Sequence, residues 1–427
     1  MKIKRQVKVQ GETGHLEQQV KQAWRFTGNE LKYIQEVLAS GSLSARHGKM
    51  ADRFEKLFAK TMGTKYAIAL NSGTSTLHCA VAAAGVGYGD EVIVPALTIV
   101  CTGAAVIHHN GTPVFADSDR RTYNIDPADI ARKITPRTKA IIVVPLAGLP
   151  CDMDPIMALA KKHNLRVIED SAQSMLSTYK GRNVGTIGDC GSFSFEQTKH
   201  ITTGDGGMLV TNDAEFGRQM RQLGCHGTRS VTAESGIWKG ALVHDYIGWN
   251  YRLPETCSAV GLAQLERLED FINLRKKIAG YYNEFIKKID WLKPQYIPQD
   301  CTHSYYSYML TFEGESELDK ASAVLQKLDS ELAAVGFKGG AFARPIYMEP
   351  GIAFNRCYGQ DAYGTSIPAD SAMWVPEEKN KYSGSCPVAE EIWLRSYNIP
   401  LFEDEKSMTE NFEKFEKVIR GFSGKQG

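Results

Sequence analysis

The segment that decides the fold of this chain is Gly191-Ser-Phe-Ser-Phe-Glu-Gln-Thr-Lys199-His-Ile-Thr-Thr-Gly-Asp-Gly-Gly207. Residues 191–195 alternate small and aromatic side chains, a pattern that predicts a strand. A second strand is predicted at 207–211, and the short turn between them makes the two strands antiparallel neighbours. Lys199 stands at this turn among hydroxyl side chains, where its neutral amine could act as a nucleophile. Most lysines are solvated surface charges, so Lys199 has to be judged by its neighbours.

Asp170 ends another predicted strand, 166–169. Ligands of α/β sheets bind at the carboxyl ends of parallel strands. A carboxylate there can pair with the protonated ring nitrogen of pyridoxal phosphate and keep the ring electron-withdrawing. The alternative interpretation is a helix N-cap, a common role of Asp and Ser.

A third motif lies nearer the N-terminus, where the predicted strand 66–70 is followed by Asn71-Ser-Gly-Thr-Ser75 and a helix. This order can bind phosphate through free backbone N–H groups, hydroxyls and the positive end of the helix dipole. Its spacing matches neither the Walker A motif nor the dinucleotide fingerprint. Ser-Gly-Thr is also ordinary helix-capping chemistry, so the motif alone is weak.

In this order of phosphate turn, strand-end Asp and lysine, the chain resembles the DegT/DnrJ/EryC1/StrS family of pyridoxal-phosphate-dependent sugar aminotransferases. That family lies within the fold-type I aspartate aminotransferase superfamily. Similar stretches run from about Gly41 to about Glu269. They include Asn71–Thr74, Gly87–Pro95, Tyr123–Asp126, Thr135–Ala140, Ile168–Gln173, Phe193–Phe195, Thr198-Lys199, Gly204–Gly207 and Gly248–Arg252.

The resemblance implies roles for individual residues. Lys199 is similar to the lysine that bonds the cofactor through an imine, and Asp170 to the partner of the ring nitrogen. Gln173 would lie near the 3-oxygen of the ring. Ser194 and the amides of Gly73 and Thr74 would hold the phosphate. Asn250 resembles an asparagine that reaches the phosphate of the neighbouring subunit, which implies a homodimer with shared active sites.

Two positions qualify the resemblance. The family has an aromatic residue stacked on the ring where this chain has Ile99, so aliphatic contact would replace stacking. A dehydratase branch of the family carries His in place of the reactive lysine. Here Lys199 occupies that place, and His200 would point to the other face by alternation. Transamination is therefore favoured; a sugar dehydratase and a non-catalytic regulator that has kept the fold are the alternatives.

The expected reaction moves an amino group from glutamate or glutamine to a small-molecule acceptor. The acceptor classes are nucleotide-linked keto-sugars, octulosonate keto-sugars and keto-cyclitols. Candidate substrate contacts are Arg229, Tyr246, Arg344 and Tyr347. A long loop is expected at about 350–385; it is either a surface insertion or a substrate-facing loop using Arg356, Tyr358, Tyr363 or Trp374.

Composition fits a globular enzyme, since 43% of the 427 residues are hydrophobic and 23% are charged. The net charge of +1 gives no basic face for nucleic acid. The nine cysteines include no Cys-x-x-Cys pair and no metal-type cluster, so we expect no metal and reduced thiols in a cytoplasmic protein. The sequence shows no secretion signal at its basic N-terminus and no apolar run long enough to cross a membrane.

Strands are also predicted at 91–94, 113–116 and 140–144, and helices at 76–84, 98–109 and 154–164. This alternation predicts an α/β fold: a three-layer α/β/α large domain with a mostly parallel sheet, plus a smaller α+β C-terminal domain. The expected division is a helical segment at 1–45, a pyridoxal-phosphate-binding domain at 46–270 and a small domain at 271–427. One long helix, beginning near Ala259, is expected to connect the two domains.

Overall fold

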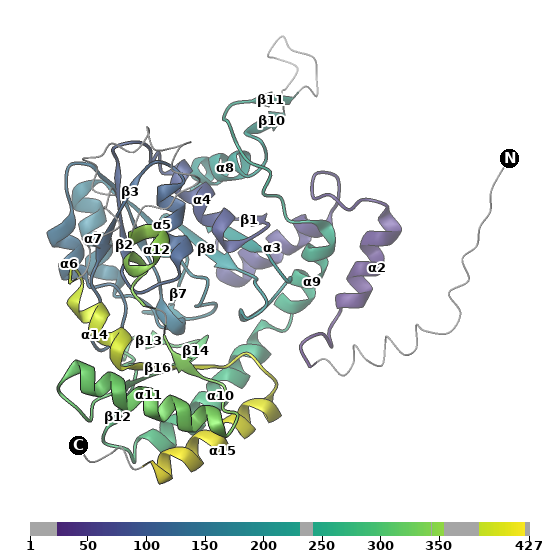
Figure 1. Cartoon of the computed structure of the whole chain (residues 1–427). Coiled ribbons are helices and arrows are strands. Elements are labelled where there is room, and N and C mark those ends of the chain that lie inside the picture. The colour runs from purple at the N-terminus through teal and green to yellow at the C-terminus, as the bar shows by residue number, and fades with distance from the viewer. Residues whose placement is uncertain (1–23, 231–241, 343, 354–383, 423–427) are drawn as a thin grey trace, which may run out of the picture.

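The computed structural model describes residues 24–230, 242–342, 344–353 and 384–422. Its centre is a seven-stranded sheet in the order β1-β9-β8-β5-β4-β2-β3 (Figure 1). The strands are β1 (Tyr66–Leu70), β2 (Glu91–Pro95), β3 (Thr112–Ala116), β4 (Thr138–Val143), β5 (Arg166–Asp170), β8 (Cys190–Ser194) and β9 (Gly207–Thr211). The neighbours from β8 to β3 pair in parallel, whereas β9 is antiparallel to both β8 and β1. The predicted mostly parallel sheet and the antiparallel pair of β8 and β9 are confirmed.

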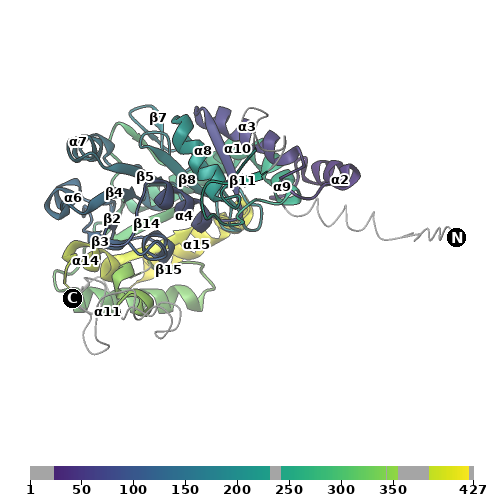
Figure 2. The same cartoon turned by 90° about the horizontal axis from the view of Figure 1, so that it is seen from above.

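Helices cover both faces of this sheet, as the view in Figure 2 shows. On one face, α4 (Gly73–Ala83), α5 (Val100–Ile107) and α8 (Ala214–Leu223) share a core with the strands. On the other, α3 (Met50–Met62) and α9 (Glu255–Leu265) form a second core, and α6 (Pro127–Lys133) and α7 (Met153–His163) a third. All five residues of β2 and all five of β8 are buried, as expected for strands covered on two faces. The predicted three-layer arrangement is confirmed.

The C-terminal part has its own antiparallel sheet in the order β12-β14-β16-β15. Its strands are β12 (Leu292–Pro294), β14 (Ser307–Phe312), β15 (Gly340–Ala341) and β16 (Ser396–Pro400). The helices α10 (Leu268–Ile286), α11 (Leu318–Ala334) and α15 (Glu405–Gly421) share its core. The single long helix expected from Ala259 is wrong, because α9 ends at Leu265 and α10 begins at Leu268. Arg267 interrupts them with φ −116° and ψ 9°, outside the helical region.

The expected domain limits at 45 and 270 stay a prediction. Some residues after 270 pack into the core of the large sheet. The 3-10 helix η3 (Ile346–Met348), α12 (Pro350–Ala353) and α14 (Pro387–Arg395) belong to the same stretch of sequence as the small sheet. Yet Ile346, Ile352 and Ala389 pack into the core under α4 and α5. In Figure 1, α12 and α14 accordingly lie beside the large sheet.

Three smaller features complete the fold. At the N-terminus, α2 (Glu30–Ser40) packs against α9 and stands at the edge of the molecule in Figure 1. A hairpin of β10 (Thr228–Ser230) and β11 (Leu242–His244) projects from the body beside α8. The strands β6 (Thr178–Tyr179), β7 (Arg182–Asn183) and β13 (Cys301–Thr302) form a small sheet.

Candidate functional site

Lys199 lies in a turn beyond the end of β8, and its side chain is partly buried. Its backbone N–H donates to the carbonyl of Glu196 over 3.0 Å, which closes the turn. The amine Nζ lies 4.5 Å from the centroid of the Tyr306 ring. The Tyr306 hydroxyl is hydrogen-bonded in turn to Oγ1 of Thr198 over 3.1 Å. The lysine is thus held next to an aromatic wall that comes from the segment before β14.

Asp170 ends β5, beside β8 in the sheet, and is 2% exposed. Oγ1 of Thr102, on α5, donates to Oδ2 of Asp170 over 2.9 Å, and the Ala172 N–H donates to Oδ1 over 3.4 Å. Burial raises the pKa of Asp170, while the bond from Thr102 and the charge of Lys199 act to lower it. Asp170 and Lys199 are therefore close enough to interact, as expected for two residues of one site.

The predicted phosphate turn forms the N-terminus of α4. Ser72 caps the helix, its Oγ accepting from the Ser75 N–H over 3.0 Å. The N–H groups of Gly73 and Thr74 lie in the first turn, which offers them no intrahelical carbonyl. A Cβ at Gly73 would come within 2.8 Å of the Ser194 Cβ, so only glycine permits this approach. The structure thus brings Gly73 and Ser194 together at a helix end suited to an anion.

Gln173 and Ile99 lie at the borders of the same region. Oε1 of Gln173 accepts from the Ala147 N–H over 2.8 Å, and Ala147 adopts a φ of +58°. Ile99 precedes the first residue of α5 and is 52% exposed. Its side chain is therefore not held in the core, and it is free to meet a ligand or a partner.

Cys101 is a site residue that the sequence did not reveal. The charge of Asp170 acts to raise the pKa of its thiol, and the charge of Lys199 acts to lower it. Burial raises the pKa of Cys101 to about 12, so the thiol stays protonated at neutral pH. Cys101 lies on α5, one residue before Thr102.

These residues fit pyridoxal phosphate. The buried carboxylate of Asp170 is matched to a cationic ring nitrogen, which would offset its desolvation. The amine of Lys199 is matched to an aldehyde carbon. The glycine-lined start of α4, with Ser194 beside it, is matched to a phosphate.

Thr102 and Tyr306 were not predicted as site residues. The spacing of Thr98 and Thr102 by one helical turn, with their hydroxyls 3.0 Å apart, was a signal that could have been followed. Tyr306 lies in His303-Ser-Tyr-Tyr306, a stretch of only weak resemblance. Nothing in its spacing places it next to Lys199.

The four predicted substrate contacts have different surroundings. Arg344 forms a two-pronged ion pair with Glu349, at 2.8 Å and 3.0 Å. Tyr347 is fully buried, and its hydroxyl donates to Glu390 over 2.6 Å. Tyr246 is partly buried against the core near α8. The Arg229 side chain lies outside the described residues, as do Arg356, Tyr358, Tyr363 and Trp374.

Asn250 is exposed, on a segment tied to the phosphate turn. The carbonyl of the next residue, Tyr251, accepts from the Asn71 N–H over 2.7 Å. Trp249 and Tyr251 stack on each other with ring centroids 5.4 Å apart. Asn250 thus lies in a segment held by backbone hydrogen bonds and faces solvent in the single subunit.

His200 is buried and hydrogen-bonded to the backbone. It is 1% exposed, its Nε2 lies 3.2 Å from the Ser304 carbonyl, and burial holds its pKa well below the usual range. A neutral imidazole that donates to a backbone carbonyl is a structural residue. This geometry agrees with the expected structural role of His200.

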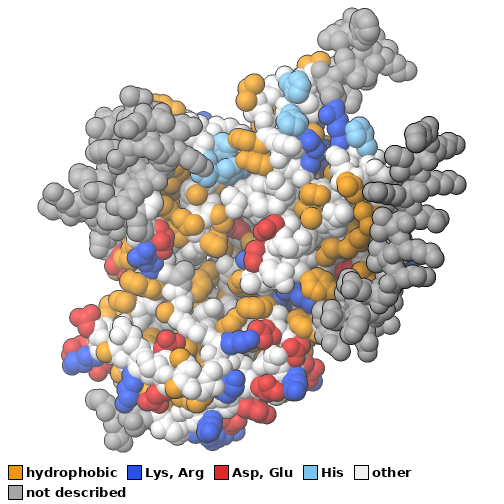
Figure 3. Space-filling view, turned by 45° about the vertical axis from the view of Figure 1, so that its right-hand side comes forward, with side chains coloured by type: hydrophobic (Ala, Val, Ile, Leu, Met, Phe, Trp, Pro, Cys, Tyr) orange, Lys and Arg blue, Asp and Glu red, His pale blue; other side chains and the backbone are white. Residues whose placement is uncertain are grey.

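Three further histidines gather with aromatic rings near the start of the hairpin. The His78 and His108 rings are joined by a 2.6 Å hydrogen bond, and Nε2 of His109 lies 3.0 Å from the His78 carbonyl. In Figure 3, histidine side chains, coloured pale blue, lie in several places on the upper part of the face. Among the described residues, no three His, Cys, Asp or Glu side chains are arranged as metal ligands.

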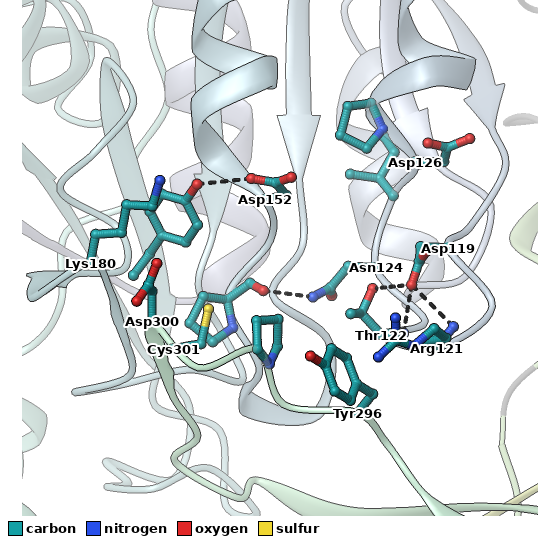
Figure 4. A pocket seen from close by; sticks show the side chains of 15 residues that line it. Asp119, Arg121, Thr122, Asn124, Asp126, Asp152, Lys180, Tyr296, Asp300 and Cys301 are labelled. Atoms are coloured by element: carbon teal, nitrogen blue, oxygen red, sulfur yellow. Dashed lines mark hydrogen bonds between the residues drawn. The ribbon is translucent and has the colours of Figure 1, made fainter.

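A separate cavity of about 480 Å³ lies where residues following β3 and β4 meet the 296–301 segment (Figure 4). Its lining mixes polar and apolar side chains, and the Arg121 guanidinium lies 3.6 Å from the Tyr296 ring centroid. None of the predicted site residues lines it.

None of the described helices is long and apolar enough to cross a lipid bilayer.

Comparison with known proteins agrees with this geometry. A profile described as the DegT/DnrJ/EryC1/StrS aminotransferase family matches residues 25–365. The GDP-perosamine synthase of Escherichia coli O157:H7 is 40% identical over 88% of this chain and 91% of its own length. A UDP-N-acetyl-3-dehydro-alpha-D-glucosamine 3-aminotransferase of Acidithiobacillus ferrooxidans is 34% identical over 87% and 88%. An aminotransferase structure from Psychrobacter cryohalolentis superposes with a TM-score of 0.76 at 31% identity, covering 92% of this chain and 96% of that one.

Proposed function

Because the chain belongs to the DegT/DnrJ/EryC1/StrS aminotransferase family, we propose that it moves an amino group from glutamate or glutamine to a nucleotide-linked keto-sugar. Membership makes the chain a pyridoxal-phosphate-dependent transaminase. The observation that carries the proposal is the placement of the buried Asp170 carboxylate at the end of β5, next to β8 and the turn that carries Lys199. Relatives named for GDP- and UDP-linked sugars support the nucleotide-linked class over octulosonates and cyclitols.

The residues of the chain divide the work among them. When bound, pyridoxal phosphate supplies an electron-withdrawing ring that stabilises negative charge on the carbon losing its proton. Asp170 would face the ring nitrogen and favour its protonated form, and Thr102 holds one oxygen of that carboxylate in place. The N-terminus of α4 and the Ser194 hydroxyl would bind the phosphate.

Lys199 would act as the acid–base group. Its amine can take the proton from the donor's α-carbon and deliver it to the cofactor carbon that receives the amino group. General acid–base catalysis of this kind raises the rate about 10²–10⁴-fold. The Tyr306 ring limits where the amine can lie, because Nζ sits 4.5 Å above it. On the acceptor sugar, the same proton movements run in the opposite order.

We also propose a homodimer in which Asn250 reaches the phosphate of the partner subunit. Asn250 is exposed in one chain, and backbone hydrogen bonds hold the segment that carries it, which suits a residue that acts across an interface. The half-exposed Ile99 and the 97% exposed Ile247 add apolar surface that a partner would cover.

The test is a product assay with purified protein and a panel of acceptors. GDP-linked and UDP-linked keto-sugars, a keto-octulosonate and an inosose would each be incubated with glutamate, then with glutamine. Mass spectrometry should show the carbonyl oxygen replaced by an amine on a nucleotide-linked sugar only. Amination of the octulosonate or the cyclitol alone would overturn the proposed acceptor. Loss of water without nitrogen uptake would indicate the dehydratase.

A further inference from the structure

Two buried arginines converge on the backbone of Lys199. Arg25, from the N-terminal segment, donates to the carbonyl of Gln197 over 2.5 Å and to the carbonyl of Lys199. Arg275, on α10, donates to the same Lys199 carbonyl over 3.3 Å and to the carbonyl of Tyr306 over 3.1 Å. Arg25 is 5% exposed and Arg275 is 2% exposed.

Both guanidinium groups are kept in the interior at an electrostatic cost. Burial lowers the pKa of Arg25 to about 10, and burial and the charge of Arg25 lower the pKa of Arg275 to about 9. Buried charges are normally paired with an opposite charge. The nearby carboxylate is Glu196, but its Oε2 accepts from the backbone N–H and the hydroxyl of Thr198. Both guanidinium groups instead donate hydrogen bonds to backbone carbonyls, those of Gln197, Lys199 and Tyr306.

The arginines are themselves held from outside the Lys199 turn. The carbonyl of Arg25 accepts from Nε2 of Gln264, on α9, over 2.6 Å, and from Arg267 over 3.2 Å. The neighbouring Trp24 ring packs edge-on against Phe271, with centroids 5.6 Å apart. Arg275 projects from the middle of α10. The N-terminal segment that carries Arg25 is thus anchored to α9 and to Arg267, and Arg275 is part of α10. From these two positions, both arginines donate to the carbonyl of Lys199.

The grip extends to the wall beside the reactive amine. Because one guanidinium bonds the carbonyls of both Lys199 and Tyr306, Arg275 links the residue that carries the amine to the ring 4.5 Å below that amine. Arg25 links the same carbonyl to Gln197, two residues earlier. A planar fork can span two carbonyls in this way, whereas a single ammonium is a point donor.

We propose that Arg25 and Arg275 are positioning residues that clamp the main chain of Lys199 and so hold its amine in register with Tyr306 and Asp170. The inference rests on the proposed function of Lys199 as the cofactor-bonding lysine. Neither arginine would touch cofactor or substrate. Their effect is on the geometry of the lysine, to which rate is sensitive, since a misplacement of about 1 Å can cost on the order of 10²-fold.

The test uses full-length protein with cofactor bound and the variants Arg25→Gln, Arg25→Lys and Arg275→Gln. Hydrogen–deuterium exchange is measured on the peptide spanning 196–203, which includes the Lys199 N–H bonded to Glu196. We expect exchange there to rise about tenfold in Arg25→Gln, equivalent to about 1.4 kcal/mol. kcat should fall about ten- to hundredfold with KM for the amino donor unchanged, and Arg25→Lys should restore only part of it.

Arg395→Gln is the matched control. Arg395 is also buried, 4% exposed, and also clamps carbonyls, those of Phe312 and Ser316, but in the C-terminal part. It should lower the melting temperature without changing exchange at 196–203. Unchanged exchange and kcat in a folded Arg25→Gln protein would overturn the clamp, as would equal loss in Arg395→Gln. If Arg275→Gln does not fold, the two Arg25 variants decide.

The clamp and the proposed function fail in different ways. Borohydride reduction of the wild-type protein followed by peptide mapping reports which lysine bonds the cofactor. A cofactor found on another lysine would overturn the role of Lys199. A cofactor on Lys199 together with wild-type behaviour of the Arg25 variants would overturn only the clamp.

Discussion

The hydroxyl of Thr102 donates to Oδ2 of Asp170 over 2.9 Å, in a region where Asp170 is only 2% exposed. The hydroxyl of Thr98, in the segment before α5, lies 3.0 Å from that of Thr102. A carboxylate held in this way cannot rotate freely. Its two oxygens are held by the Thr102 hydroxyl and the Ala172 N–H.

The substitution Asp170→Asn should have opposite effects on stability and on catalysis. Burial raises the pKa of Asp170, which means that the charged form is unfavourable in the folded protein without a cationic partner. Asp170→Asn keeps an oxygen for Thr102, so the melting temperature of cofactor-free protein should stay the same or rise. Turnover should fall about 10²–10³-fold, the usual effect of losing one preorganised electrostatic group. An unchanged rate would show that the carboxylate is misassigned.

Lys199→Ala should abolish the covalent bond to the cofactor. Turnover should fall by at least about 10²–10⁴-fold, the share of acid–base catalysis alone. The fold should persist, because the amine is only partly buried. Borohydride trapping and circular dichroism check both points. The exposed Lys180, which pairs with Asp154 at the surface, provides the control Lys180→Ala, expected to behave as wild type.

Gly73→Ala tests the phosphate turn. The new Cβ would come within 2.8 Å of the Ser194 Cβ, and such overpacking costs about 1–3 kcal/mol. Cofactor affinity should fall roughly ten- to hundredfold, while kcat at saturating cofactor changes less. Gly87→Ala is the control, since a Cβ there meets nothing within 4 Å. Equal cofactor affinity for the two variants, measured by equilibrium titration, would count against a phosphate site at α4.

Acid should destabilise the protein through its buried histidines. Burial lowers the pKa of His78 to about 4 and that of His303 to about 3, from an unfolded value near 6.5. Between these pKa values the unfolded chain binds more protons than the folded one. The contribution of these neutral histidines to the free energy of unfolding is therefore full above about pH 6.5 and is lost as the pH falls toward 4. The melting temperature should therefore drop between pH 7.5 and pH 5.

His78→Gln should reduce this pH dependence, because the amide does not titrate. The exposed His163, at the end of α7, supplies the control His163→Gln, which should keep the full drop. The comparison is made by differential scanning fluorimetry at both pH values. An equal drop in wild type and His78→Gln would show that His78 does not carry the effect.

Subunit mixing tests the role of Asn250 across an interface. Lys199→Ala and Asn250→Ala homodimers should each be impaired. Their heterodimer should regain activity in one of its two sites, which pairs an intact Lys199 with an intact Asn250 from the partner subunit. Tandem affinity purification with two tags isolates the heterodimer. No activity in a verified heterodimer would argue that each chain completes its own site.

Much of the large sheet could be predicted because its signals are local. Strands such as 66–70 and 91–94 are short runs of mostly apolar residues, and the helices between the strands have their own periodicity. The break between α9 and α10 was missed because the apolar spacing continues across Arg267 while its backbone does not. The engagement of Tyr347 with Glu390 was also missed, since 43 residues separate the two.

The sequence by itself determined which groups could do chemistry: a lysine after a strand, an acid at a strand end and a glycine at a helix start. These are local patterns, and each side chain follows from the element that carries it. Only the tertiary structure decided that Thr102 holds Asp170, that Tyr306 lies below the lysine amine, and that Arg25 and Arg275 meet at one carbonyl. Arg25 and Lys199 are 174 residues apart along the chain. Their contact depends on how helices pack against the sheet, which no local pattern encodes.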